Sequence, residues 1–143
     1  MLLSTVLKAK GNDVIAVAED AKVMDIARII ATRRIGAVVV TDGEGKLAGI
    51  VSERDVVKGL VAGSGKVTDM MARAIMSRNV ITATPQTTVE EAMAIMDRGY
   101  FRHLPVLDGE AIVGIVSVRD TVRAHIESQG QEVESLKSYI FRA

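Results

Sequence analysis

GIVSERD, residues 49–55, and GIVSVRD, residues 114–120, agree at six of seven positions and begin 65 residues apart. In each, three residues typical of a packed strand precede Ser-x-x-Asp, which is the spacing of a helical capping box. One copy would indicate only the start of a helix. Two copies, each with an Arg before the Asp that a cap does not need, indicate a repeated unit whose strand-to-helix corner has a second purpose.

The repeat extends well beyond this corner. VMDIARIIATRRIGAVVVTDG begins at Val23, and VEEAMAIMDRGYFRHLPVLDG begins at Val89, 66 residues later. The separation then falls to 65, because DGEGKLAG contains one residue more than DGEAIVG. Turns tolerate such changes in length best. The chain is therefore predicted to contain two copies of one unit.

Each copy contains the same predicted elements in the same order. A short apolar strand near residues 14–18, or 80–83, precedes a helix. The apolar positions of this helix follow the i, i+3, i+4, i+7 spacing of one buried stripe: Val23, Ile26, Ala27 and Ile30 in one copy, and Val89, Ala92, Met93 and Met96 in the other. Thr87 or Thr88 is expected to cap the second of these helices. A hairpin and a final helix complete a β-α-β-β-α unit.

This pattern predicts an α/β (α+β) fold with two β-α-β-β-α repeats packed about a pseudo-twofold axis. The expected divisions are a first repeat at 8–64, a linker helix at 65–78, a second repeat at 79–128 and a C-terminal amphipathic helix at 129–143. A unit of about 60 residues buries little surface alone, so the repeats are expected to share one core. Val133, Leu136 and Ile140 form the apolar side of the last helix, which is expected to help a second chain dock.

The composition excludes several classes of function. The 143 residues carry 18 basic and 18 acidic side chains, 3% aromatic residues and no Cys. Zero net charge and few aromatics argue against binding to nucleic acid or to an anionic membrane surface. No apolar run approaches the roughly 20 residues of a membrane span, and no signal peptide is evident. A soluble, cytoplasmic protein without disulfides is expected.

The repeated corner has chemistry suited to a nucleotide. A helix N-terminus presents free N–H groups and the positive end of a dipole, which favour phosphate. The Ser hydroxyl can donate to a phosphate, and the Arg can pair with it in charge-assisted hydrogen bonds. The Asp carboxylate would repel phosphate, but its two oxygens can accept hydrogen bonds from the vicinal hydroxyls of a ribose. The chain has no glycine-rich phosphate loop, so a P-loop or Rossmann site is excluded.

The order and spacing of the elements, the HLPVLD strand at 103–108 and both corners resemble a tandem pair of CBS (cystathionine-β-synthase) domains, also called a Bateman module. The resemblance extends from about Asp13 to Glu127. It implies two clefts between the repeats that bind adenosine-containing ligands: AMP above all, ADP or ATP, and in some members NAD(H) or S-adenosylmethionine. It also implies a homodimer in which four repeats form a flat disc.

The resemblance assigns residues to each cleft. In the first cleft, the base would contact Ile15, Ile35 and Ala37, and the ribose and phosphate would contact Asp120, Ser117 and Arg119. In the second cleft, the corresponding residues are Ile81 and Phe101, then Asp55, Ser52 and Arg54. Arg102 and His103 match basic positions that face phosphate, although His103 could equally be an ordinary surface residue. Copy one has Gly36 and Ala37 at these positions, so the clefts are not expected to be equivalent, and the sequence leaves open which cleft the basic pair serves.

Other candidate residues have simpler interpretations. Arg33 and Arg34 end a predicted helix, where basic side chains suit the dipole and are usually solvated. His125 is expected to pack, and Met93 and Met96 to fill the core. The chain offers no Ser-His pair with a third partner, no catalytic cofactor is implied, and two isolated histidines without Cys argue against a metal site.

These observations predict a regulatory module, not an enzyme, that binds an adenine nucleotide and signals by a conformational change to another, unidentified protein chain. Three alternatives stay open. The first is a sensor of NAD(H) or S-adenosylmethionine. The second is an interaction or dimerisation module without a ligand, although such a module would need only the helix cap. The third is nucleotide turnover, for which the sequence provides no base or metal site.

Overall fold

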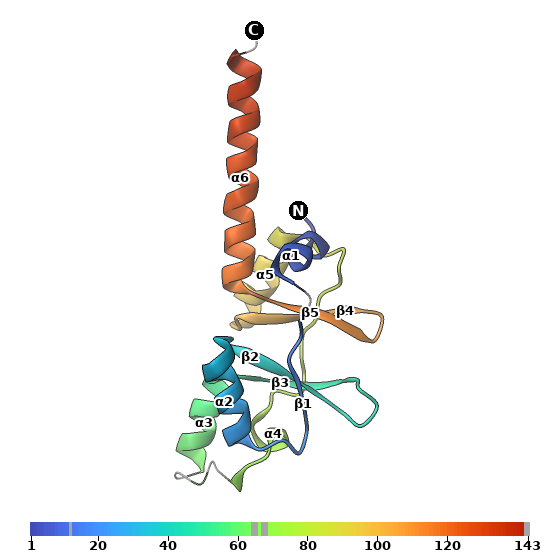
Figure 1. Cartoon of the computed structure of the whole chain (residues 1–143), viewed down its shortest axis with the longest axis vertical. Coiled ribbons are helices and arrows are strands. Elements are labelled where there is room, and N and C mark those ends of the chain that lie inside the picture. The colour runs from blue at the N-terminus through green and yellow to red at the C-terminus, as the bar shows by residue number, and fades with distance from the viewer. Residues whose placement is uncertain (12, 64–65, 67–68, 142–143) are drawn as a thin grey trace.

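Two stacked hairpins form the centre of the molecule, with helices on the outer side of each (Figure 1). This computed structural model describes residues 1–11, 13–63, 66 and 69–141. The layers run helices, sheet, sheet, helices, and each sheet belongs to one repeat. The predicted mixed α+β fold of two related repeats is confirmed.

The first repeat contains a three-stranded sheet in the order β1-β2-β3. β1 (Ala16–Ala18) pairs parallel with β2 (Ala37–Thr41), and β2 pairs antiparallel with β3 (Leu47–Ser52). α2 (Val23–Arg33) and α3 (Glu53–Ala62) cover its outer face. β2 is buried almost throughout, as its continuous apolar run predicts.

Within the described residues, the second repeat has the same order of elements but no counterpart of β1. α5 (Val89–Gly99), β4 (His103–Asp108), β5 (Ala111–Ser117) and α6 (Val118–Phe141) follow one another. The strand predicted near residues 80–83 is wrong, since only an isolated bridge joins Ala83 to Val106. In the first repeat the Val39 N–H donates to the Ile15 carbonyl at 3.2 Å. The residue equivalent to Val39 is Pro105, which has no N–H to donate, so the pairing ends there.

The capping predictions are confirmed in both repeats. The hydroxyl of Ser52 accepts a hydrogen bond from the Asp55 N–H at 3.3 Å, and an Asp55 carboxylate oxygen accepts one from the Ser52 N–H at 2.9 Å. These two bonds form a reciprocal capping box at the start of α3. Thr88, one of two candidates, caps α5 by accepting from the Glu91 N–H at 3.1 Å.

α6 is one continuous helix of 24 residues, so the predicted division between a last repeat helix ending at 128 and a separate terminal helix is wrong. Gly130 is the weakest helix former near that boundary, and its cost of roughly 1 kcal/mol relative to Ala does not end the helix. None of the helices in the described ranges has the length and apolarity needed to span a membrane.

The expected single core is also wrong, because the buried apolar residues divide into two clusters, one for each repeat. Each cluster is completed by a helix that precedes the other repeat in sequence. α1 (Leu3–Lys10) contributes Leu3, Val6 and Leu7 to the second repeat. α4 (Ala72–Ile75) and the adjoining Met76 contribute to the first. The two repeats therefore exchange their leading helices.

A glycine in the last strand of each repeat receives the exchanged segment. Leu7 lies against Gly114 in β5, and Met76 lies against Gly49 in β3. Ile50 beside Gly49 exchanges two backbone hydrogen bonds with Ser77, at 3.1 and 2.9 Å. Any side chain at these glycines would occupy the space that the incoming segment fills, so the close approach depends on the missing Cβ atoms.

We predict that Gly49→Ala destabilises the protein by about 1–3 kcal/mol, because the new methyl group would lie 2.9 Å from the Ser77 carbonyl oxygen, which is fixed backbone. Gly43→Ala is the matched control, since no atom lies within 4 Å of a methyl group at Gly43. That control should change stability by less than about 1 kcal/mol. Urea unfolding measures the stability of both variants. Equal stability would contradict the close packing of the Met76 segment against Gly49.

Candidate functional site

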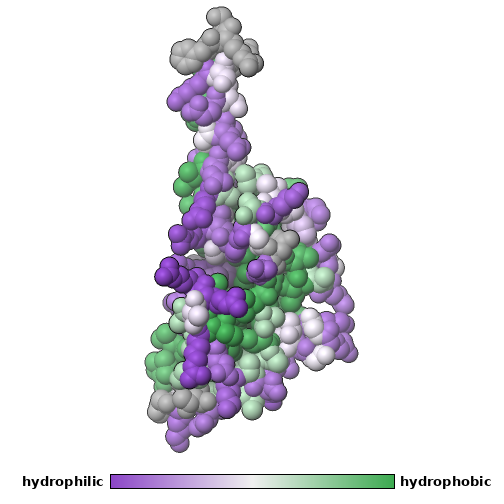
Figure 2. Space-filling model, viewed as in Figure 1, coloured by the Kyte–Doolittle hydropathy of each residue, from purple (hydrophilic) through white to green (hydrophobic). Residues whose placement is uncertain are grey.

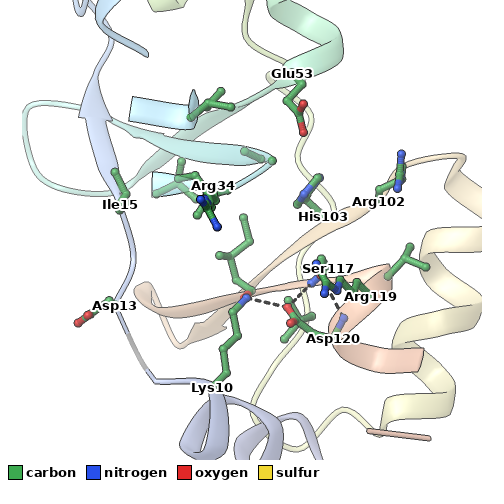
Figure 3. A pocket seen from close by; sticks show the side chains of 18 of the residues that line it. Lys10, Asp13, Ile15, Arg34, Glu53, Arg102, His103, Ser117, Arg119 and Asp120 are labelled. Carbon is green, nitrogen blue, oxygen red and sulfur yellow. Dashed lines mark hydrogen bonds and ion pairs between the residues drawn. The ribbon is translucent and has the colours of Figure 1, made fainter. Parts of the chain in front are cut away.

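A cleft of about 840 Å³ lies between the two hairpins, and residues of both repeats line it (Figure 3). The first repeat contributes the segment just before β1, the second half of α2, the start of β2 and the first turn of α3. The second repeat contributes the start of β4, the end of β5 and the first turn of α6. The volume falls within the ~300–1,000 Å³ range of small-molecule sites.

The residues predicted for the first cleft all line this cavity. Ile15, Ile35 and Ala37 come from the first repeat, and Ser117, Arg119 and Asp120 come from the second. The first three provide apolar surface, and the last three surround the N-terminus of α6. The cleft therefore places an apolar wall opposite a helix N-terminus, a hydroxyl, a guanidinium and a carboxylate.

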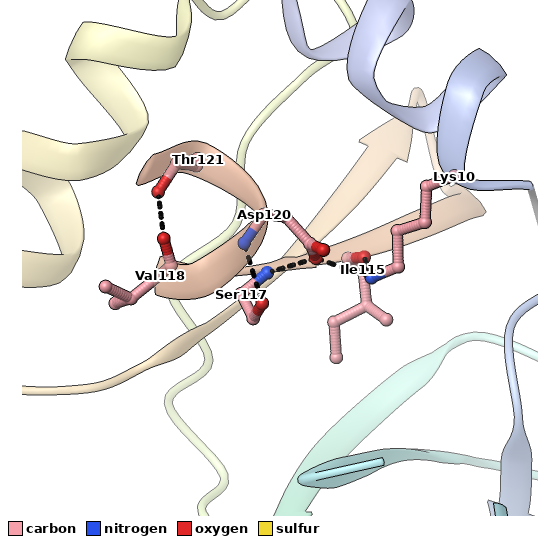
Figure 4. Close-up of polar contacts among 6 residues, drawn as sticks. All are labelled: Lys10, Ile115, Ser117, Val118, Asp120 and Thr121. Atoms are coloured by element: carbon pink, nitrogen blue, oxygen red, sulfur yellow. Dashed lines mark hydrogen bonds and ion pairs between the residues drawn. The ribbon is translucent and has the colours of Figure 1, made fainter. Parts of the chain in front are cut away.

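The α6 corner is a second reciprocal capping box (Figure 4). The Asp120 N–H donates to the Ser117 hydroxyl at 3.1 Å, and the Ser117 N–H donates to Oδ2 of Asp120 at 2.9 Å. Among the described residues, every hydrogen bond to this carboxylate falls on Oδ2. Its Oδ1 therefore retains acceptor capacity for a ligand hydroxyl.

Lys10, which the sequence analysis did not single out, bridges the N-terminal helix and this corner. Its ammonium donates to Oδ2 of Asp120 at 2.6 Å and to the Ile115 carbonyl at 2.7 Å (Figures 3 and 4). Lys10 lies one turn after Leu7, the residue seated on Gly114. No pattern in the sequence reveals this contact, because it follows from the exchange of α1 onto the second repeat.

The environment shifts the pKa of two groups in the cleft. Partial burial acts to raise the pKa of Asp120, but the Lys10 ammonium and the Ser117 N–H outweigh it, so this pKa lies below its ordinary value. Burial lowers the pKa of His103, and the nearby Arg102 and Lys10 cations lower it further. Asp120 is therefore ionised and His103 neutral at pH 7.

The structure places Arg102 and His103 in the lining of this cleft. A methyl group added at Gly36 would lie 2.5 Å from Nε2 of His103 and 3.2 Å from Oε1 of Glu53. The half-buried His103 ring thus occupies space that Gly36 leaves open. The small residues of one copy accommodate the large basic residues of the other, which explains why the two copies differ at these positions.

The cleft is rich in cations. Besides His103 it is lined by five basic residues, Lys10, Arg34, Arg102, Arg119 and Arg123, against three acidic ones, Asp13, Glu53 and Asp120. In Figure 2 a strongly hydrophilic band crosses the body beside hydrophobic surface, at the height where the repeats meet. This local excess of positive charge contrasts with the zero net charge of the chain.

Arg34 was predicted to be a solvated helix end, and it is exposed at the end of α2, but it also lines the cleft. It ends α2 in the left-handed conformation, with φ 54°, and its side chain points toward the cavity in Figure 3. The equivalent residue of the second repeat, Tyr100, has φ 56° and is 90% exposed. Because Arg and Tyr are unlike, comparison of the two copies gave no signal for this position.

The residues predicted for the second cleft do not line this cavity: Ile81, Phe101, Ser52, Arg54 and Asp55. Ile81 is 50% exposed, and Phe101 packs against the core of the second repeat. The Ser52 hydroxyl lies 3.0 Å from Asp55 and can donate to it, and no described cation pairs with this carboxylate as Lys10 does with Asp120. The second cleft stays a prediction.

Two related repeats, each a helix, a hairpin and a further helix, with a cleft between them that has an apolar wall and several cations, are typical of a class of tandem-repeat ligand-binding modules. The comparison with protein families is specific: the CBS domain model matches residues 10–62 and 72–127, and the chain belongs to the CBS domain family. No group of three or more His, Asp or Glu residues suited to a metal ion occurs within the described part of the chain.

Relatives of known sequence or structure agree with this assignment. A CBS domain-containing mitochondrial protein of Arabidopsis thaliana is 36% identical over 96% of this chain and 71% of its own length. A CBS-domain-containing protein from Agrobacterium tumefaciens is 35% identical over 87% of this chain and 92% of its own, with a TM-score of 0.83. Because one relative is named mitochondrial, the cytoplasmic location stays a prediction.

One solved neighbour contains ligands. The CBS domain pair of protein MJ0100, in complex with 5′-methylthioadenosine and S-adenosyl-L-methionine, is 28% identical, with a TM-score of 0.78. The alignment covers 87% of this chain and 99% of that one. CBS pairs that bind adenosine-containing molecules are thus among the structural neighbours of this chain.

We predict that Lys10→Met raises the pKa of Asp120, because it removes the cation that holds this pKa down. An Asp whose pKa is lowered by folding stabilises the folded state above its unfolded pKa, and this contribution disappears as the pH falls below about 4. The stability difference between wild type and Lys10→Met should therefore shrink from pH 7 to pH 3. Carboxylate NMR titration and urea unfolding measure both effects.

Lys8→Met is the control for this prediction, since Lys8 lies on the same helix, is exposed, and does not line the cleft. It should leave the Asp120 titration unchanged. An Asp120 pKa that stays the same in Lys10→Met would contradict the bridge between α1 and the corner.

Proposed function

We propose that this protein is a regulatory module that binds an adenine nucleotide, AMP in the first instance, in the cleft between its repeats. The proposal rests chiefly on one observation: Asp120, Ser117 and Arg119 converge on the N-terminus of α6 and face an apolar wall from the other repeat. That arrangement matches the three parts of a nucleotide.

Each part of the ligand has candidate partners in the cleft. The adenine ring would lie between the apolar side chains of Ile15 and Ile35, next to Ala37. The ribose hydroxyls would donate to the Asp120 carboxylate, whose Oδ1 is available. The phosphate would accept from the α6 N-terminus and the Ser117 hydroxyl and pair with Arg119.

Further cations favour a phosphate over other groups at this end of the ligand. Arg34, Arg102 and Arg123 add positive charge around the cleft. Burial and the nearby cations lower the pKa of His103, and a phosphate beside it would act in the opposite direction, because an adjacent anion favours the charged imidazole. The site is thus suited to AMP, ADP or ATP, and NAD(H) satisfies the same requirement.

S-adenosylmethionine is the second candidate, because an adenosine-binding neighbour carries it. Its sulfonium is a cation, and a cleft with five basic and three acidic side chains disfavours it. A nucleotide that bears phosphate is therefore the better candidate.

Binding would act by regulation and not by catalysis. The ligand would contact both repeats, so it would favour the relative arrangement in which both sets of contacts form. We propose a homodimer as the signalling unit, which passes the change to a further protein. Apolar residues stay exposed at equivalent positions of the two repeats, Val57 and Val61 on α3 and Val122 and Ile126 on α6, and these are suited to contact between chains.

The first test is thermal unfolding of ligand-free protein with AMP, ADP, ATP, NAD, NADH and S-adenosylmethionine. A ligand at 100 times its Kd adds about 2.7 kcal/mol, which shifts Tm by several degrees for a domain of this size. Asp120→Ala should abolish the shift. Asp55→Ala loses the same capping box in the other repeat and lines no part of the cleft, so it should keep the shift.

The outcomes separate the candidate functions. A shift with S-adenosylmethionine alone would replace the proposal by the second candidate. No shift with any ligand would favour an interaction module whose corners serve as helix caps. Equal loss of the shift in both Asp variants would show that the capping boxes act through stability and not through contact with ligand.

A second prediction concerns Arg34, whose left-handed backbone costs about 1 kcal/mol in a residue with a side chain. Arg34→Gly should raise the stability of the free protein and weaken nucleotide binding several-fold, because a cation leaves the cleft. Tyr100→Gly relieves the same conformation in the other repeat and should stabilise without any change in affinity. Calorimetric titration measures the nucleotide affinity of the two variants, and urea unfolding measures their stability. An unchanged affinity in Arg34→Gly would show that Arg34 is not part of the proposed site.

A further inference from the structure

The second half of α6 stands clear of the body (Figure 1). Every residue from Gln129 to Ser138 is exposed, and apolar residues interrupt the hydrophilic surface of the projecting helix in Figure 2. Val133, Leu136 and Ile140 are 49%, 61% and 64% exposed. Large apolar side chains on an isolated helix are unfavourable in water, so this face is suited to a partner.

The exposed apolar residues follow a heptad repeat. Starting from Val122, the positions advance by 4, 3, 4, 3 and 4 residues, which is the alternation of the d and a positions of a coiled coil. We define the α6 seam as these six residues: Val122, Ile126, Gln129, Val133, Leu136 and Ile140. All of them are exposed.

The α6 seam is separate from the face that holds α6 to its own body. Thr121 and Ala124 are buried and Ser128 is half-buried, and these three occupy c and f positions of the same heptad numbering. Position f lies opposite the a and d positions on a helix. The body and a second helix can therefore contact α6 at the same time.

The projecting segment needs such a contact for its own stability. From Gln129 onward it makes about three turns without burial, and it contains Gly130. Isolated helices shorter than ~12–15 residues are marginal in water, and an internal glycine costs roughly 1 kcal/mol relative to Ala. A partner that covers the seam would offset this deficit.

We propose that the occupant of the seam is α6 of a second copy of this chain, in a parallel, in-register, two-stranded coiled coil. The a positions hold Ile126, Val133 and Ile140, which are β-branched, and a d position holds Leu136. This combination favours two strands over three or four. Gln129 introduces one polar layer, whose amides meet across the axis only when the helices are in register.

The charges beside the seam select the parallel orientation. Glu132 occupies a g position, and Lys137, five residues later, occupies the following e position. In a parallel pair a g residue faces the next e residue of the other helix, so each Glu132 would meet the partner's Lys137. Antiparallel helices would pair g with g and e with e, which brings like charges together. Within one helix the Lys137 ammonium lies 3.7 Å from Glu134, an exposed contact that leaves it free to turn to the partner.

The arrangement fixes which repeats meet in the dimer. A parallel seam that begins at Val122, in the second turn of α6, brings the two second repeats next to each other. This inference specifies the homodimer of the proposed function but does not depend on nucleotide binding, so its test is carried out without ligand.

The test uses the absence of Cys from the native chain. In a parallel, in-register coiled coil, identical seam positions face each other within the Cα separation that a disulfide requires, about 4.4–6.8 Å. Leu136→Cys should therefore form a disulfide-linked dimer under mild oxidation of the dilute protein. Gln131→Cys and Ser138→Cys, at exposed f positions of the same helix, should not. Equal cross-linking at seam and f positions, or none at Leu136→Cys, would overturn the proposal.

Charge reversal tests the orientation independently. Glu132→Lys places like charges at two sites per dimer and should raise the dimer Kd about tenfold in sedimentation equilibrium. The double variant Glu132→Lys, Lys137→Glu should restore the wild-type value to within about threefold. Glu134→Lys makes the same charge change at a b position and is the control, expected to stay within about threefold. An unchanged Kd in Glu132→Lys would overturn the parallel arrangement, because antiparallel helices keep like charges at facing g positions whichever sign residue 132 carries.

Discussion

The close contact of each leading helix segment with a glycine in the last strand of the other repeat is the constraint on which the rest of the structure depends. Leu7 can reach Gly114 only because that residue has no side chain. The position of Leu7 fixes α1, and α1 places Lys10 on Asp120. The chain must then cross from the second repeat to the first, and this crossing places Ile15, just before β1, in the lining of the cleft. One packing contact thus determines both the interior of a repeat and one wall of the cleft.

The cleft also depends on differences between the copies. Where one repeat has Gly36 and Ala37, the other has Arg102 and His103, and the His103 ring lies where a side chain on Gly36 would be. Perfect symmetry at these positions would either crowd the cleft with four large side chains or leave it without its basic pair. The difference between the copies at these positions thus adds two basic side chains to the cleft of a chain of zero net charge.

Much of this could be predicted from the sequence because it is encoded locally. Periodicity located α2 and α5, the corner motif located both capping boxes, and the offset between copies located the hairpins. Residues Ile15 and Asp120 were expected to lie near each other only through resemblance to a family. The absence of a strand at 80–83 could have been predicted, since Pro105 has no N–H to donate at the position where Val39 donates to Ile15 in the first repeat. Lys10 and Arg34 were not, because their positions depend on the exchange of α1 and on the left-handed end of α2.

The exchange of leading helices bears on the ancestry of the fold. A single repeat standing alone would present an unfilled groove beside its glycine and a helix with no groove of its own. Two identical copies would fill both grooves and bury both helices by domain swapping, in which each copy packs its leading helix against the other around a true twofold axis. The tandem chain contains the same reciprocal packing within one polypeptide, since α1 completes the second repeat and α4 completes the first. Gene fusion would then have joined the two chains of such a dimer into one polypeptide, after which the sequences of the two halves could differ.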